Sequence, residues 1–141
     1  SAAPRPDMPK SLWSDITKSV IKDVKSFKMG TPGDSSNFIN AVIEDRAFKK
    51  LSGYLDQAKK DDDAEIIVGG GYDDSVGYFI EPTVIVTTNP QYETMCTELF
   101  GPIITIKIYE YAQWEQVLDL VDQTGEYDLK GAIFSQDRYV I

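Results

Sequence analysis

An acidic residue, an aromatic residue and a Gly-Pro pair stand directly ahead of a run of β-branched residues. The stretch TELFGPIITIKIY places Glu98, Phe100, Gly101 and Pro102 immediately before residues 103–109. The run is typical of a buried strand, and a core strand needs no such entrance. A carboxylate can accept two hydrogen bonds, and an aromatic ring offers a flat apolar face. The stretch is therefore either a binding site or a combination of a helix-end acid, a core aromatic and an ordinary turn.

The residue types that usually carry nucleophilic and metal chemistry are almost missing. The chain has no histidine, which removes the Ser-His-Asp arrangement and most zinc sites. Cys96 is the single cysteine, so no disulfide can form within the chain, and a reducing compartment is favoured. No base or cationic residue adjoins Cys96 in the sequence to activate its thiol. We interpret Cys96 as a small, partly buried side chain and not as a nucleophile.

Two other stretches suggest a ligand at first sight. Asp61, Asp62 and Asp63 follow a pair of lysines without the spacing of an EF-hand, which indicates a solvated helix end or loop. The glycines at 69–71 lack the Lys and Ser or Thr of a phosphate-binding loop, and turn-forming residues follow them instead of a helix. We predict no metal site and no phosphate-binding loop.

The composition is that of one globular domain. The 141 residues are 42% hydrophobic and 26% charged, which is ordinary for such a domain. The net charge of −9 argues against a nucleic-acid partner, because phosphate backbones are bound by clustered Lys and Arg. No apolar run approaches the roughly 18 residues of a membrane helix, and residues 1–10 lack the apolar core of a secretory signal. We expect neither a nucleic acid nor a membrane as partner.

Hydrophobic periodicity predicts helices that alternate with strands. Apolar residues three and four apart predict helices at 10–27, 45–60 and 112–123, with a short helical turn within 91–98. Apolar and β-branched runs predict strands at 65–68, 78–85, 103–109 and 131–135, the second of them one or two strands broken at Pro82. This alternation predicts an α/β domain, with a layered, mostly parallel sheet and flanking helices.

Four ordered segments resemble the aldehyde dehydrogenase family. ELFGPIITI resembles its E-x-F-G-P signature, and MGTPGD resembles its G-x-P-x-D turn. GYFIEPTVI resembles its G-x-[FY]-x-x-P-T strand, and YDLKGAIFSQD resembles its Y-G-L-x-x-x-[VI]-F segment. KSLW, DDSVGYFIEP and GAIFSQD further resemble the Δ1-pyrroline-5-carboxylate (glutamate-γ-semialdehyde) dehydrogenase branch. The matches cover most of the chain and occur in the same order as in the family, which argues against a chance resemblance.

The resemblance implies an activity, a cofactor and site residues. It implies an NAD-dependent enzyme of the mitochondrial matrix that oxidises glutamate-γ-semialdehyde to glutamate in proline breakdown, and that forms a homo-oligomer when complete. It assigns Glu98 to the ribose hydroxyls beside nicotinamide and Phe100 to the nicotinamide ring. It aligns Ser1 with the residue after the family's catalytic cysteine, where a serine contacts the α-carboxylate of the substrate.

The same alignment implies that the chain is incomplete. The nucleophile is expected just before Ser1, and residues 1–141 are expected to be a partial catalytic domain without the coenzyme-binding domain or the oligomerisation segment. We expect such a piece to be inactive alone and to act with the remainder of its own enzyme chain. The alternative hypothesis is a free-standing, non-catalytic binding or interaction domain with an aldehyde dehydrogenase-like fold.

Overall fold

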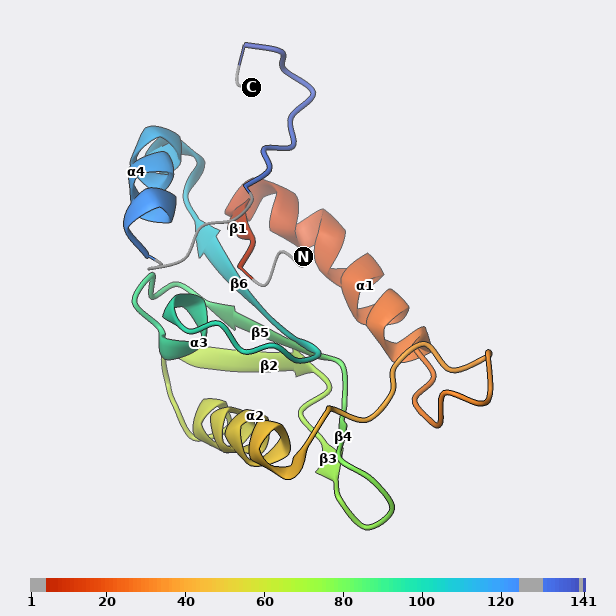
Figure 1. The fold of residues 1–141 in the computed structure, drawn as a ribbon. Coiled ribbons are helices and arrows are strands. Elements are labelled where there is room, and N and C mark those ends of the chain that lie inside the picture. Colours follow the sequence, from red (N-terminus) through yellow and green to blue (C-terminus); the bar gives the residue numbers. More distant parts are fainter. Residues whose placement is uncertain (1–4, 125–130, 140) are drawn as a thin grey trace.

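The computed structural model describes residues 5–124, 131–139 and 141 and shows an α/β arrangement (Figure 1). Its elements, in chain order, are β1 (Asp7–Pro9), α1 (Lys10–Ser26), α2 (Asp45–Ala58), β2 (Ala64–Val68), β3 (Tyr72–Asp73), β4 (Phe79–Ile80), β5 (Thr83–Thr87), α3 (Glu93–Cys96), β6 (Ile103–Tyr109), the 3-10 turn η1 (Tyr111–Gln113) and α4 (Trp114–Thr124). These elements confirm the predicted helices and the first three predicted strands.

The main sheet is dominated by parallel pairing. Its strand order is β1-β6-β5-β2 within the described residues. The β1–β6 and β5–β6 pairs are parallel, and only β2 runs antiparallel to its neighbour β5. A separate two-stranded ribbon of β3 and β4 extends from this sheet. The predicted fold class, a layered and mostly parallel sheet with flanking helices, is confirmed.

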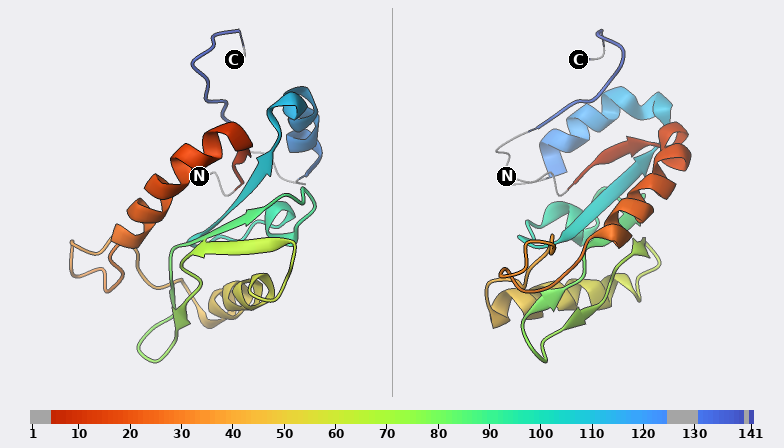
Figure 2. Two further views of the ribbon diagram at one scale, coloured as in Figure 1. Left: turned by 180° about the vertical axis from the view of Figure 1, so that it is seen from behind. Right: turned by 90° about the vertical axis from the view of Figure 1, so that its right-hand side faces the viewer.

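Each face of the sheet is covered by different helices (Figure 2). On one face, Val84 and Ile106 pack with the apolar stripe of α1, including Trp13 and Val20. The opposite face belongs to a larger cluster that brings together α2, α3 and the sheet, with these buried members: Phe48, Leu51, Leu55, Ala58, Ile80, Ile85, Tyr92, Met95, Leu99 and Ile103. Because successive side chains of β5 and β6 point to opposite faces of the sheet, these strands pack into two separate cores.

Strand β6 lies between β1 and β5 and is largely buried, with Ile104 near its start the exception at 40% exposed. Ile103, Thr105, Lys107 and Tyr109 are all at most 5% exposed. The intervening Ile106 is buried on the α1 side. Because most of its side chains are covered, the segments at its ends offer more exposed groups to a ligand than the strand does.

The predicted strand at 131–135 is wrong. Residues 131–139 are irregular and exposed, and Phe134 is 95% exposed. A strand requires backbone groups of a neighbour to complete its hydrogen bonds, and no described residue pairs with this segment. The run GAIF has residues that favour a strand, but residue preference alone does not form a strand without another strand to pair with.

Other short strands were missed or merged. Strands β1 and β3 were not predicted, because strands of three and two residues are too short to show alternation. The predicted strand at 78–85 is two strands, β4 and β5, separated at Glu81 and Pro82, so the predicted break at Pro82 is confirmed. Strand β4 belongs to the two-stranded ribbon and β5 belongs to the main sheet, so the chain must break between them.

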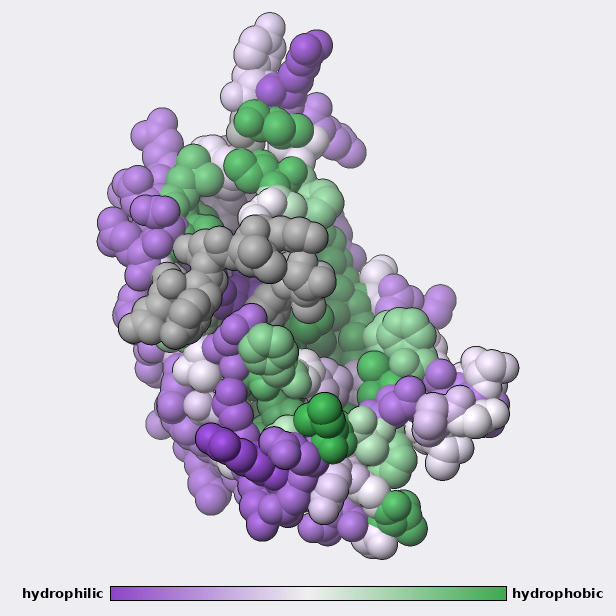
Figure 3. Space-filling model, viewed as in Figure 1, coloured by the Kyte–Doolittle hydropathy of each residue, from purple (hydrophilic) through white to green (hydrophobic). Residues whose placement is uncertain are grey.

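The surface is uneven in polarity. On the face shown in Figure 3, hydrophilic side chains cover α4 and the outer side of α2, whereas apolar side chains are visible along α1 and between α1 and α2. Among the described residues, no helix combines the length and the apolar content needed to cross a membrane.

Truncating the core side of α2 should destabilise the fold. Leu55 is completely buried, so Leu55→Ala removes apolar contacts and leaves a cavity that costs about 2–5 kcal/mol of unfolding free energy. Arg46→Ala, a change at an exposed position of the same helix, should stay within about 0.5 kcal/mol. Urea unfolding of the two variants measures the difference, and equal midpoints would contradict the assigned core.

Candidate functional site

The segment between α3 and β6 exposes two of its side chains and buries the one between them. Leu99 is 5% exposed and belongs to the core under α2. Glu98 is exposed, and Phe100 is 82% exposed. Leu99 thus anchors the turn while its two neighbours project outward. Phe100 is therefore not a core aromatic, which removes one part of the ordinary-turn interpretation.

The backbone of Phe100 is strained. Its φ is +55°, and it is the one residue other than glycine with positive φ in the described part of the chain. For a bulky side chain this left-handed conformation costs about 1–3 kcal/mol and persists only where the surroundings hold it. Such strain is frequent at ligand-binding positions. The conformation directs an aromatic ring into solvent at an energetic cost, and core packing does not explain it.

Two long-range hydrogen bonds hold this turn. The Lys50 ammonium on α2 donates to the carbonyl of Glu98 at 2.9 Å. At the other end of the turn, the backbone N–H of Thr83 donates to the carbonyl of Pro102 at 2.8 Å. The turn is therefore fixed to α2 at its start and to the beginning of β5 at its end.

Gly101 allows the turn to lie directly against α2. A Cβ atom at this position would be 2.5 Å from Cδ1 of Leu51, which is completely buried. Atoms of Leu51 occupy the space that any larger residue at 101 would need. The Gly-Pro pair in the sequence thus has a steric reason: glycine permits the close approach, and proline stiffens the entry to β6.

The two neighbouring lysines of α2 have different partners. Lys49 forms an exposed ion pair with Asp45 at 2.7 Å, and the hydrogen bond from this pair raises the pKa of Lys49. Lys50, one residue on, points instead to the turn and donates to Glu98. The sequence alone offered no signal for this role, because Lys50 and Glu98 are 48 residues apart.

The Glu98 carboxylate is available to a ligand. None of the described residues forms a hydrogen bond or ion pair with its side-chain oxygens. Two free carboxylate oxygens can accept hydrogen bonds from two adjacent hydroxyl groups. The exposed aromatic ring of Phe100, two residues along the chain, offers a flat apolar surface. Glu98 and Phe100 are thus two exposed side chains of the same turn.

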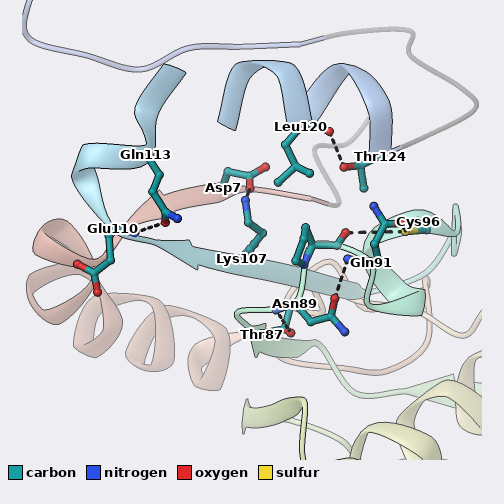
Figure 4. A network of polar contacts seen from close by, with 11 residues as sticks. Asp7, Thr87, Asn89, Gln91, Cys96, Lys107, Glu110, Gln113, Leu120 and Thr124 are labelled. Atoms are coloured by element: carbon teal, nitrogen blue, oxygen red, sulfur yellow. Dashed lines mark hydrogen bonds and ion pairs between the residues drawn. The ribbon is translucent and has the colours of Figure 1, made fainter. Parts of the chain in front are cut away.

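The other predicted site residue, Ser1, lies outside the described residues. The nearest described part of that segment is Arg5, whose Nη1 donates to the carbonyl of Met95 on α3 at 3.2 Å. Cys96 is partly buried, as expected, and its sulfur lies 3.9 Å from the carbonyl of Pro90 and 3.8 Å from Oε1 of Gln91 (Figure 4). These contacts are weak and include no base that could activate the thiol.

The acidic run and the glycine run are both used by the fold. Asp63 accepts a 2.7 Å hydrogen bond from Thr87 on its carbonyl and a 2.9 Å bond from Asn89 on its carboxylate, so the run forms the turn between α2 and β2. Gly69 and Gly70 have positive φ, and the N–H of Gly70 donates to a threonine hydroxyl. Within the described ranges, no three side chains come together as metal ligands would.

Comparison with known proteins places the chain in a family. The aldehyde dehydrogenase family profile matches residues 1–141, which is the whole chain. The chain belongs to the aldehyde dehydrogenase family. This membership confirms the resemblance drawn from the four sequence segments.

Individual members of the family are closely similar. The chain is 46% identical to a mitochondrial Δ1-pyrroline-5-carboxylate dehydrogenase of Dictyostelium discoideum, over 100% of this chain and 25% of that protein. The corresponding enzyme of Danio rerio is 44% identical over 100% of this chain and 26% of its own length. The chain thus spans about a quarter of the length of the curated relatives that it matches.

Solved structures of the family share the fold. The Δ-pyrroline-5-carboxylate dehydrogenase of Mycobacterium tuberculosis superposes with a TM-score of 0.91 and 34% identity, over 99% of this chain and 26% of that one. A second structure of that enzyme, bound with NAD, has a TM-score of 0.87 and 34% identity, over 99% of this chain and 25% of that one. The aldehyde dehydrogenase-like fold predicted from the sequence is confirmed.

Enlarging Gly101 should disturb the site through its contact with Leu51. Gly101→Ala forces a Cβ into the space of a buried leucine, and such overpacking costs about 1–3 kcal/mol. Gly53→Ala is the matched control, since nothing lies within 4 Å of its added Cβ and helix α2 should gain about 0.5–1 kcal/mol. Thermal unfolding of both variants should give shifts of opposite sign, and a neutral Gly101→Ala would contradict the close contact.

Proposed function

We propose that the complete protein containing this chain is an NAD-dependent dehydrogenase that oxidises glutamate-γ-semialdehyde, formed from Δ1-pyrroline-5-carboxylate, to glutamate. The observation that carries the proposal is the outward-facing Glu98 and Phe100 on a strained, anchored turn. Membership of the aldehyde dehydrogenase family and the similarity to Δ1-pyrroline-5-carboxylate dehydrogenases support this choice of substrate. They do not favour the alternative of a free-standing, non-catalytic domain.

The compartment and assembly follow the same relatives. Curated relatives carry the name mitochondrial, so we assign the enzyme to the mitochondrial matrix and to proline breakdown. Residues 1–141 form part of the catalytic domain in this proposal. The coenzyme-binding domain, the oligomerisation segment and the cysteine nucleophile belong to the remainder of the enzyme, which acts as a homo-oligomer.

Glu98 binds the ribose next to nicotinamide in this proposal. Its carboxylate is exposed and has no partner among the described residues, so it can accept hydrogen bonds from both ribose hydroxyls. Hydrogen bonds to a charged acceptor are shorter and stronger than those between neutral groups, which suits a residue that must hold a ring in one orientation. Lys50 holds the carbonyl of Glu98, so the carboxylate projects from a fixed backbone.

Phe100 provides the surface for the nicotinamide ring. An 82% exposed ring on a backbone with φ of +55° is held in place before the ligand arrives. When bound, NAD supplies the acceptor for the hydride that leaves the aldehyde carbon. The phenylalanine would offer the nicotinamide ring a flat apolar surface, and the buried Leu99 beneath the turn keeps the phenylalanine from moving inward.

Removing the charge of Glu98 should impair catalysis without impairing the fold. Glu98→Gln keeps the shape of the side chain but weakens its acceptors, and a displacement of about 1 Å at a reacting centre can lower kcat on the order of 100-fold. Because Glu98 is exposed, the unfolding temperature should not change. Glu115→Gln, an exposed acid on α4, is the matched control and should keep full activity. Steady-state kinetics with glutamate-γ-semialdehyde test this, and an unchanged kcat for Glu98→Gln would refute the assignment.

Ser1 should discriminate between substrates. We propose that its hydroxyl donates to the α-carboxylate of glutamate-γ-semialdehyde, a group that simple alkyl aldehydes lack. A hydrogen bond to a charged group contributes roughly 1.5–3 kcal/mol, so Ser1→Ala should lower kcat/KM for the semialdehyde roughly 10- to 150-fold. A short alkyl aldehyde should be oxidised at nearly the same rate by both forms. Equal losses on the two substrates would show that the serine supports the nucleophile and not the carboxylate.

A further inference from the structure

A buried ion pair joins the first strand to the central strand of the sheet. Nζ of Lys107 on β6 lies 2.6 Å from Oδ1 of Asp7 on β1, with the two side chains 6% and 13% exposed (Figure 4). The ammonium group also lies 5.6 Å from the centre of the Tyr109 ring. A cavity of about 30 Å³ borders the pair beneath α4 and has room for about one water molecule. Buried charges of this kind are poor general stabilisers, and their best-attested use is to select one arrangement among several.

This pair specifies the register of β1. Asp7 and Lys107 are directly opposite in the parallel β1–β6 ladder. A shift of one residue would turn Asp7 to the other face, where Met8 and Ile106 pack in the α1 core, and would bury a carboxylate without a partner. A three-residue strand forms few backbone hydrogen bonds and cannot select its register strongly by itself. The side-chain charges therefore make the choice.

The register of β1 determines where Arg5 and Pro6, the described residues ahead of it, meet the neighbouring elements. Parallel strands begin at the same edge of a sheet, and β6 begins directly after the Glu98 and Phe100 turn. The entry to β1 is bonded on the same side: the N–H of Lys107 donates to the carbonyl of Pro6 at 3.0 Å, and Arg5 donates to the carbonyl of Met95. Helix α3, which contains Met95, leads into that same turn.

We propose that Asp7 and Lys107 act as a positioning pair that sets the segment entering β1 against the cofactor turn. The pair contacts neither substrate nor cofactor and works through the register of β1. The inference rests on the proposed function, since the segment before Arg5 holds the proposed carboxylate contact and follows the proposed nucleophile. The pair thereby sets the separation between the aldehyde and the hydride acceptor.

A second ion pair joins the same two segments and provides a matched control. Lys10 and Glu110 follow β1 and β6 directly and are 2.7 Å apart, but their side chains are 68% and 64% exposed. Solvent screens such a pair, and losing it leaves no buried charge. The Lys10 pair therefore links the same strands without selecting their register.

Kinetics and cofactor binding of the complete enzyme test the proposal. In Lys107→Met, kcat/KM for glutamate-γ-semialdehyde and for a short alkyl aldehyde should both fall by about 100-fold, as for a misplaced reacting group. The Kd for NAD⁺, measured by titration calorimetry, should be unchanged because the turn at Glu98 is held from α2 and β5. The exchange Asp7→Lys/Lys107→Asp should restore most of the activity, and Lys10→Met should keep all of it.

A second variant covers loss of folding. If Lys107→Met does not fold, Asp7→Asn/Lys107→Met leaves no unpaired charge and carries the same expectation for kcat/KM and Kd. Folded variants that lose thermal stability but keep kcat/KM would overturn the proposal, as would a weakening of NAD⁺ binding equal to the loss of kcat/KM. Failure of the charge exchange to restore activity would also overturn it. An unmutated enzyme without aldehyde oxidation would instead overturn the proposed function, and this inference with it.

Discussion

The parallel pairing of β6 with β5 on one side and β1 on the other determines where each part of the proposed site can lie. Parallel strands begin at one edge, so the segments that enter β1, β5 and β6 meet there. Backbone hydrogen bonds join these entries: Thr83 donates to Pro102, and Lys107 donates to Pro6. The turn at residues 98–102 and the residues just before β1 are brought together by this ladder, although more than 90 residues separate them in the chain.

The same position of β6 explains why the binding groups lie in a turn. Both faces of the strand are covered, by α1 on one side and by α2 and α3 on the other. Most side chains of the strand therefore belong to the cores, and the exposed groups of the proposed site come just before it. Leu99 satisfies the core, and its neighbours Glu98 and Phe100 remain available.

The strained backbone at Phe100 and the close packing at Gly101 belong to the same turn and depend on the same contacts. A left-handed phenylalanine persists because the turn is held at the carbonyl of Glu98 by Lys50 and at Gly101 by contact with Leu51. Two of the contacts that hold the turn come from α2, so the stability of that helix and the shape of the site are linked. An aromatic ring held outward in this way is ready for a flat ligand without rearrangement.

Most elements with a clear repeat were predictable from the sequence. The helical periods of α1, α2 and α4 and the β-branched run of β6 reflect local preferences together with the burial of one face, and both are visible in the residue order. The strand expected at 131–135 was wrong, and β1 was missed. In both cases the deciding factor is a neighbouring strand, which the local sequence does not contain.

The sequence by itself determined the family, the outline of the helices and the identity of Glu98, Phe100, Gly101 and Pro102 as a unit, because these residues are adjacent and their chemistry is local. Only the tertiary structure decided which side chains face outward and what holds them. Lys50 meets Glu98 across 48 positions and Lys107 meets Asp7 across 100. These contacts depend on the order of strands in the sheet. That order arises from packing of the whole chain and cannot be predicted from the local sequence pattern.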